Sequence, residues 1–320
     1  MLVAIVGDTM LGRGVAEALT AVAPASLVEP EIAAMLREAD VTVLNLECCI
    51  SDRGAPIQLP GKPYFFRAPP HAVELLVHLG VDCVTLANNH ALDFGEVALL
   101  DTLHHLQTAG ISWVGAGADG VQAQLPVTLT AGGDELTVIG FTDHPAAFAA
   151  GPARPGVAYV DLRTTLDPWL VTALSEAQQG CLLVTPHWGP NMTTEPNSDI
   201  RRAGEQLMRC GAAVVAGHSA HVFHGVQGGR QGTVLYDVGD FLDDYRVDPL
   251  LRNDLGLLFL IDLADGRPRR LQAVPLKLEY CYTRRATGTD ARWITNRFQR
   301  ACAAFGHDVS VVDGRLTITW

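Results

Sequence analysis

Donor side chains follow the short apolar segments of this sequence with unusual regularity. LVAIVG is followed by Asp8, VTVLNL by Glu47 and CLLVTP by His187. The full series is Asp8, Glu47, Asn89, His90, Asp143, His144, His187, His218, His221 and Asp240. Carboxylate, amide and imidazole groups without thiolate suit divalent ions such as Mn, Fe or Zn. Helix capping alone would not explain the series, because caps favour Ser, Thr, Asp and Asn and give no reason for His.

The apolar segments predict the strands and helices that must position these side chains. Short runs rich in Val, Ile and Leu alternate with segments of helical period, which is typical of repeated βα units. Strands are expected at residues 2–6, 41–46, 82–87, 111–114, 136–142, 181–185, 212–216 and 233–238. Helices are expected at residues 14–22, 29–38, 70–79, 96–109, 166–178 and 198–210. Because ligands in open α/β sheets bind beyond the carboxyl ends of parallel strands, we expect the donors to share one hollow.

The pattern changes after about residue 255. Residues 255–263 and 270–283 are predicted to form antiparallel strands, followed by a helix near 290–305 and a hairpin at 308–319 that turns at Asp313-Gly314. We therefore expect a single domain, 1–320, in which residues 1–245 form the motif-bearing α/β core and residues 255–320 add strands and a helix.

Composition excludes several classes of protein. The formal net charge of -12 does not favour a nucleic-acid partner, because binding to phosphates needs a surplus of Lys and Arg. No apolar run approaches the roughly 18–20 residues that a membrane-spanning helix needs, and the N-terminus MLVAIVGD lacks a basic signal region. We expect a cytoplasmic protein with a small-molecule or peptide substrate. The sequence leaves the oligomeric state open.

Seven blocks, read in order, resemble the CapA-type family of poly-γ-glutamate capsule synthesis, which is related to calcineurin-like metallophosphoesterases. The blocks are GDTMLGR (7–13), NLE (45–47), KPYFFRAPP (62–70), LANNHALDFG (86–95), HWGPN (187–191), GHSAHVFHGV (217–226) and YDVGDF (236–241). Single blocks such as NLE are weak signals, whereas the ordered series is specific. The resemblance implies an α/β fold, a metallophosphoesterase-like sandwich of two mixed β-sheets flanked by helices.

The resemblance also implies roles for individual residues. The implied metal ligands are Asp8, Glu47, Asn89, His187, His218 and His221. The implied catalytic groups are His90, as the acid that protonates a leaving group, together with Asp8, His187 and His221. The candidate substrate-binding residues are Arg13, Lys62, Arg67 and Trp188; the last is equally compatible with a place in the pocket wall. Asp93 is expected to orient His90.

Three departures from the phosphoesterase pattern leave the reaction open, the first being Glu47 in place of the bridging Asp. Met10 stands where the first block has a His ligand, and a thioether is a poor ligand for a hard divalent ion. His218 and His221 are separated by one residue more than the usual pair. A metal-dependent hydrolase of a phosphoester or related bond is favoured. The alternatives are a metal- and cofactor-independent peptide epimerase that exchanges a proton at an α-carbon, and a non-catalytic partner in poly-γ-glutamate synthesis.

Overall fold

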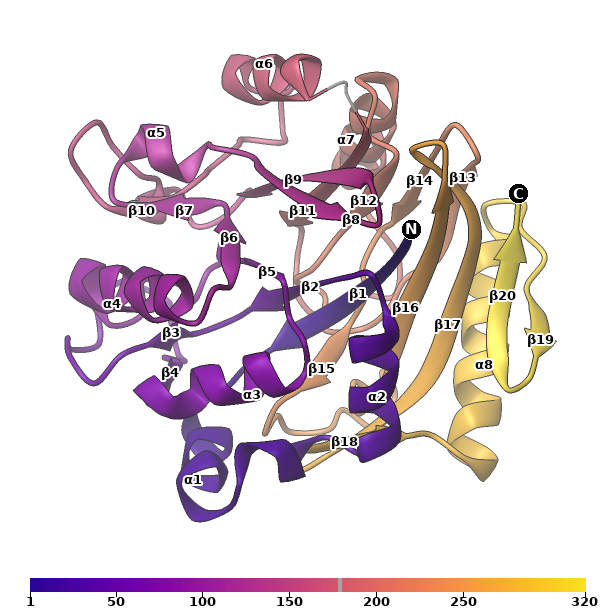
Figure 1. Ribbon diagram of the computed structural model, residues 1–320, viewed down its shortest axis with the longest axis horizontal. Coiled ribbons are helices and arrows are strands. Elements are labelled where there is room, and N and C mark those ends of the chain that lie inside the picture. The colour runs from indigo at the N-terminus through magenta and orange to yellow at the C-terminus, as the bar shows by residue number, and fades with distance from the viewer. Residues whose placement is uncertain (178–179) are drawn as a thin grey trace.

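The computed structural model describes residues 1–177 and 180–320, and its strands form a 10-stranded and a 6-stranded sheet, with two shorter pairs (Figure 1). The spatial order of the larger sheet is β19 (Ser310–Val312), β20 (Arg315–Thr319), β17 (Arg267–Glu279), β16 (Leu255–Ala264), β1 (Leu2–Thr9), β2 (Val41–Leu46), β5 (Cys83–Thr85) and β6 (Ser112–Val114), with β15 (Asp240–Leu242) paired to β1 and β18 (Tyr282–Arg285) to β17. Strands β1, β2, β5 and β6 are parallel, whereas β16 pairs with β1 antiparallel.

The second sheet is also mixed. Its order is β13 (Val226–Gly229), β14 (Gly232–Leu235), β12 (Val214–Ala216), β11 (Cys181–His187), β9 (Asp134–Thr142) and β8 (Val127–Ala131). The inner four strands are parallel and the two edge strands are antiparallel to their neighbours. The two short pairs are β3 (Cys49–Ile50) with β4 (Arg67–Ala68), and β7 (Ala116–Gly117) with β10 (Gly156–Val157).

Helices cover the outer faces of both sheets, except that the last helix packs its buried side chains into the core between them. They are α1 (Arg13–Ala21), α2 (Pro30–Glu38), α3 (Val73–His78), α4 (Gly95–Thr108), α5 (Gly120–Ala123), α6 (Pro168–Glu176), α7 (Ser198–Arg209) and α8 (Gly288–Ala303), with 3-10 turns at Pro24–Leu27, Pro70–Ala72 and Ala146–Phe148. In Figure 1, α6 and α7 lie near the top, and α8 lies beside β20. None of the described helices combines the length and the apolarity that a membrane crossing requires.

Both faces of β1 are buried, because side chains alternate across a strand. Val3 and Ile5 pack into the core between the two sheets, with Val138 of β9 and Leu183 of β11. Ala4 and Val6 pack into a second core under α1 to α4. A third core lies between the other sheet and helices α6 and α7. The mixed two-sheet sandwich flanked by helices, which the resemblance implied, is confirmed.

Most predicted elements are present with shifted ends. The helix predicted at 70–79 divides into a 3-10 turn and α3, and that at 166–178 is observed as α6, its last predicted residue lying outside the described part of the chain. The predicted hairpin turn has positive φ angles of 51° at Asp313 and 72° at Gly314, as a type I′ turn requires. The single-domain organisation, with its division near residue 250, stays a prediction.

Glycine at position 7 lets two strands meet at the end of β1. The pairing of β1 with β2 shifts register between Val6 and Asp8, and Asp8 lies opposite Asp240 of β15. The Asp8 backbone N–H donates to the carbonyl oxygen of Gly239 at 2.9 Å. A bulge of this kind redirects a side chain, and here it places two carboxylates side by side.

Gly7→Ala is expected to destabilise the protein, because an added Cβ would lie 2.1 Å from the carbonyl oxygen of Gly239. Overpacking of this kind costs about 1–3 kcal/mol. Urea unfolding followed by circular dichroism measures the change. Gly120→Ala is the control, since its Cβ would meet nothing closer than 3.6 Å. Equal unfolding midpoints for the two variants would contradict the prediction.

Candidate metal centre

Four buried side chains from separate segments meet at the carboxyl ends of the strands. Asp8 ends β1, Glu47 follows β2, His221 lies in the loop after β12 and Asp240 begins β15. One donor atom of each lies within 4.8 Å of the donor atoms of the other three. His221 is the most exposed of the four, at 8%. The convergence predicted from the strand ends is present for these residues.

Asp8 lies at the centre of this group. Its Oδ1 accepts a hydrogen bond from the Asn45 amide at 2.7 Å and lies 3.0 Å from Nδ1 of His218. Its Oδ2 lies 3.2 Å from Nδ1 of His221. Burial by itself would raise the pKa of Asp8, but the hydrogen bonds and charges of the two histidines lower this pKa well below its usual value. Asp8 is therefore an anion at neutral pH.

The loop that carries His221 is held in a strained conformation. Ser219 and His221 have positive φ angles of 110° and 58°, which non-glycine residues rarely adopt. Asp237 supports the loop, since its carboxylate accepts hydrogen bonds from the backbone N–H of Ala220 at 2.7 Å and of Gly239 at 2.8 Å. This geometry aims Nδ1 of His221 at Asp240, 2.8 Å away. The strain thus serves to place the imidazole among the carboxylates.

Several polar atoms around the group are buried without a hydrogen-bond partner among the described residues. They are Oε1 of Glu47, Oδ1 of Asn89, Nε2 of His187 and Oδ2 of Asp240. Buried polar groups are normally paired, so unpartnered oxygen and imidazole atoms converging on one place fit a divalent cation. Burial, with the charge of Asp8, raises the pKa of Glu47 well above its usual value, which a nearby cation would reverse.

His187 and His218 lie next to each other at the ends of β11 and β12, joined by an isolated parallel bridge. Nδ1 of His187 is 3.4 Å from the amide nitrogen of Asn45. Burial lowers the pKa of His187 well below its usual value, although the charge of Asp8 opposes this. The ring is therefore neutral, which is the form that binds metals.

His90 faces the group from the loop after β5. Its ring stacks on Phe66 with a centroid distance of 3.9 Å, and its Nδ1 lies 2.6 Å from Oδ2 of Asp93. This contact leaves Nε2 on the side of Glu47, 3.9 Å from Oε1. Burial outweighs the favourable charge of Asp93 and lowers the pKa of His90 to about 4. A neutral ring with Nε2 free can take up a proton, and Asp93 stabilises the imidazolium that forms.

Lys62 contacts the residues on either side of His90 in the loop after β5. Its ammonium group lies 2.8 Å from Oδ1 of Asp93 and donates to the carbonyl oxygen of Asn89 at 2.7 Å. The side chain is only 8% exposed. Lys62 thus contacts the loop that holds His90, and its charge is already paired.

A cavity of about 450 Å³ opens onto the group. Its lining residues are Arg13, Tyr64, Phe66, His90, Asn191, Met192, His221, Asp244, Tyr245, Arg246 and Asn253. The guanidinium of Arg13 pairs with Asp244 and lies 4.9 Å from the centroid of the Phe66 ring. The hydroxyl of Tyr245 points to Glu47, 3.5 Å from Oε2. The cavity therefore combines aromatic walls with polar groups at its mouth and floor.

Three of the predicted substrate-binding residues do not line this cavity, namely Lys62, described above, Trp188 and Arg67. Trp188 is 2% exposed and its indole N–H donates to the carbonyl oxygen of Tyr236 at 2.9 Å, so it packs in the core beneath α7. Arg67 donates to the carbonyl oxygen of Arg53 at 3.2 Å, and its guanidinium lies 4.2 Å from the centroid of the Phe94 ring. Neither lines the cavity at the metal centre. Arg13 does line it, and its role in binding substrate stays a prediction.

Sequence reasoning missed the roles of several residues. Asn45 bonds to Asp8 and also accepts from the amide of Asn88 at 3.0 Å. Asn88 donates to the Leu46 carbonyl at 2.8 Å and accepts from the N–H of His90. Asp240 was expected among the donors at the strand ends, but not among the implied metal ligands. Their positions inside the blocks NLE, NNH and YDVGDF were the available signal; Tyr245, outside every block, had none.

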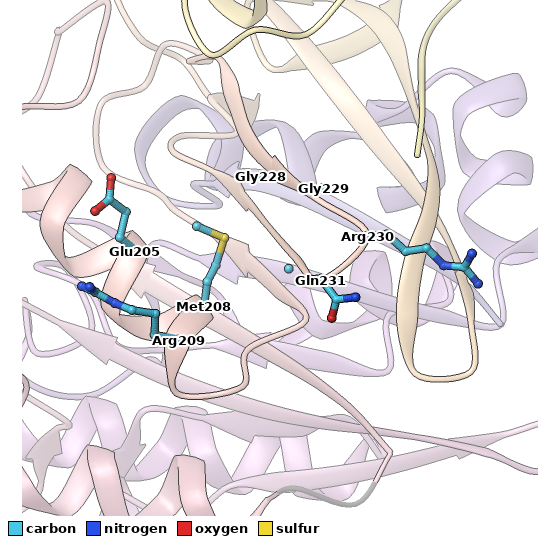
Figure 2. A pocket seen from close by; sticks show the side chains of 8 residues that line it. Glu205, Met208, Arg209, Gly228, Gly229, Arg230 and Gln231 are labelled. Carbon is cyan, nitrogen blue, oxygen red and sulfur yellow. The ribbon is translucent and has the colours of Figure 1, made fainter.

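A further cavity, of about 530 Å³, lies between α7 and the hairpin of β13 and β14. Figure 2 shows Glu205, Met208 and Arg209 on the helix, and Gln231 on the hairpin. Its hairpin residues precede β14, whereas the metal-centre residues follow the strands. This cavity therefore lies at the opposite end of the strands from the metal centre. Its lining residues include neither histidine nor aspartate.

Solved structures share this fold. A structure described as a novel phosphatase from Mycoplasma pneumoniae aligns with a TM-score of 0.55 and 12% identity, over 87% of this chain and 93% of that one. A hypothetical protein from Thermus thermophilus aligns with a TM-score of 0.52 and 17% identity, over 87% of this chain and 99% of that one. At these identities the likeness concerns the fold, which is metallophosphoesterase-like.

Sequence relatives are closer. A Mycobacterium tuberculosis protein named "probable polyglutamine synthesis accessory protein" is 34% identical over 283 residues, covering 83% of this chain and 73% of that protein. The PGA biosynthesis protein CapA of Bacillus subtilis is 27% identical, covering 75% of this chain and 62% of that protein. The family model described as "Bacterial capsule synthesis protein PGA_cap" matches residues 2–245, which include every residue of the metal centre. The chain therefore belongs to this bacterial capsule synthesis protein family.

Proposed function

We propose that this protein is a metal-dependent hydrolase of a phosphoester or related bond in a small-molecule or peptide substrate. The observation that carries the proposal is the set of unpartnered, buried donor atoms around Asp8, with the Nε2 of His90 facing the same place. The metallophosphoesterase-like fold supports it, because enzymes of that fold class use metal ions at the same ends of their strands.

The ion would be held by carboxylate, amide and imidazole groups. Asp8, Glu47, His221 and Asp240 form its nearest set, and Asn89, His187 and His218 add donors at the rim. A bound Mn, Fe or Zn ion supplies Lewis acidity and lowers the pKa of bound water. Asn45 orients Asp8, and Asp237 fixes the loop of His221. The oxygen-rich set is typical of hard or borderline ions.

His90 is the residue proposed to handle protons. Asp93 holds its Nδ1, Phe66 holds the ring plane and Nε2 points to the cluster. From that position the ring can give a proton to a leaving oxygen after taking one up. Arg246 lines the cavity and offers positive charge to an anionic substrate, whereas the charge of Arg13 is paired with Asp244.

Metal binding is expected to depend on Asp240 and Glu47, each of which has one buried carboxylate oxygen without a hydrogen-bond partner among the described residues. Asp240→Asn and Glu47→Gln should each weaken Mn binding at least about tenfold, since even changes beyond the ligands cost about 10–100-fold. Equilibrium dialysis followed by elemental analysis measures the bound metal. Glu205→Gln, in the cavity of Figure 2, is the control and should bind Mn as the parent does. Equal Mn content in all three variants would count against this site.

His90→Gln is expected to lower kcat for hydrolysis of p-nitrophenyl phosphoesters about 10²–10⁴-fold, the usual contribution of a positioned acid or base. Its metal content should stay unchanged, because the ring is not in the nearest donor set. His104→Gln, on the exposed side of α4, is the matched control. Hydrolysis that survives in His90→Gln would remove His90 from the chemistry. Biological activity that survives without any hydrolysis would favour a non-catalytic role in poly-γ-glutamate synthesis, in line with the names of the relatives.

Metal-independent epimerisation of a peptide is the second candidate, and one observation favours it. Met10 occupies the position of a metal-binding His, and its sulfur accepts the backbone N–H of Gly12 at 3.0 Å. The site thus has fewer donors than a two-metal phosphatase. Solvent deuterium incorporation at a peptide α-carbon that persists in EDTA would support epimerisation. Turnover that stops in EDTA and returns with Mn would support hydrolysis instead.

A further inference from the structure

A third cavity, of about 360 Å³, lies between α8 and the segment that leads into α7. Three arginines line it: Arg201 from α7, and Arg297 and Arg300 from α8. Its walls also contain Trp293 and Phe305. None of these residues contributes to the metal centre.

Arg297 is the innermost of the three. One terminal nitrogen, Nη1, donates to the carbonyl oxygen of Leu251 at 2.8 Å. The other, Nη2, is buried and has no hydrogen-bond partner among the described residues. The guanidinium lies against the rings of Phe223 and Trp293, 5.0 and 5.3 Å from their centroids. Burial, with the charge of Arg300, lowers the pKa of Arg297 to about 10, so the group remains charged at neutral pH.

Little negative charge offsets these cations. Arg201 lies 3.7 Å from Glu195, whose side chain is 79% exposed, so this pair is weak. In the described part of the chain no ion pair joins Arg297 or Arg300 to a carboxylate. A protein with a formal net charge of -12 has ample acidic residues, yet three guanidinium groups share this cavity with one carboxylate.

Guanidinium groups recognise phosphate and carboxylate oxygens, because their N–H donors match both in geometry. We propose that the cavity between α7 and α8 binds an oxyanion with two or more negative charges, of the phosphate or carboxylate class, at a site separate from the metal centre. Arg201 and Arg300 would donate to this anion at the rim, and the charge of Arg297, whose Nη2 is buried beneath them, would attract it. The proposal does not rest on the reaction of the metal centre.

The anion site adjoins the segments that shape the metal centre. Leu250 lines it, in the same loop as Arg246 and Asn253 of the other cavity. Gly225, four residues after His221, packs so closely on α8 that an added Cβ would lie 2.2 Å from the carbonyl oxygen of Ala301. A ligand in the cavity would therefore contact the loops of Leu250 and Gly225, and other residues of the same two loops line the cavity at the metal centre.

Isothermal titration of the EDTA-treated 320-residue chain with inorganic phosphate and, separately, with glutarate tests the proposal. We expect saturable binding of at least one anion, weakened about tenfold or more in Arg201→Gln and Arg300→Gln, since each loses a charge-assisted hydrogen bond. Arg292→Gln is the matched control on the same helix, exposed but outside the cavity, and should bind as the parent does.

The two arms separate the two chemical sources of the anion. Binding of phosphate alone would assign a phosphorylated ligand, and binding of glutarate alone a carboxylate ligand. Both substituted side chains lie at the rim, so their loss should leave thermal unfolding unchanged. Absence of saturable binding for both anions would overturn the proposal, as would an affinity that Arg201→Gln and Arg300→Gln leave unchanged.

Discussion

Repulsion among three buried carboxylates is the constraint on which the site depends. Asp8, Glu47 and Asp240 are each 1% exposed or less and share a space of 4.8 Å with His221. Like charges at this distance in a medium of low polarity cannot all remain ionised without compensation. Two imidazoles and the amide of Asn45 compensate Asp8, and Glu47 and Asp240 still have raised pKa values. Such an arrangement is compatible with a bound divalent cation, whose charge would offset the repulsion.

The three carboxylates are held together by the close approach of backbone segments rather than by the packing of side chains. Gly7 and Gly239 let β1 and β15 touch, and Gly217, whose added Cβ would lie 2.3 Å from the Trp188 indole nitrogen, lets the His218 loop lie on the core. The metal-centre side chains therefore come from strand ends and tight turns whose positions the rigid sheets determine. Such positions tolerate little movement, which is what a coordination site requires.

Sequence reasoning located this region because strand ends are visible as apolar runs, and Asp8, Glu47 and His221 each follow one. Sequence reasoning could not assign different roles to adjacent residues of the same type. The side-chain amide of Asn88 bonds to Leu46 of β2 and to the backbone N–H of His90, whereas Asn89 has an oxygen without a partner among the described residues; only the turn geometry decides this difference. Trp188 and Arg67 were expected to contact substrate, but a buried carbonyl and a nearby aromatic ring provide their partners. Tyr245 and the three-arginine cavity arise from long-range packing, which no local pattern encodes.

The place of β16 in the larger sheet has a consequence for how the family segment folds. The family match ends at residue 245, yet Leu2–Ile5 of β1 form their antiparallel ladder with β16, and Phe259 of β16 fills the core between the sheets. A fragment that stops at the family boundary would leave the open edge of β1 ready to pair with another chain. Self-association of such fragments, rather than a smaller native domain, is the outcome that the strand order implies.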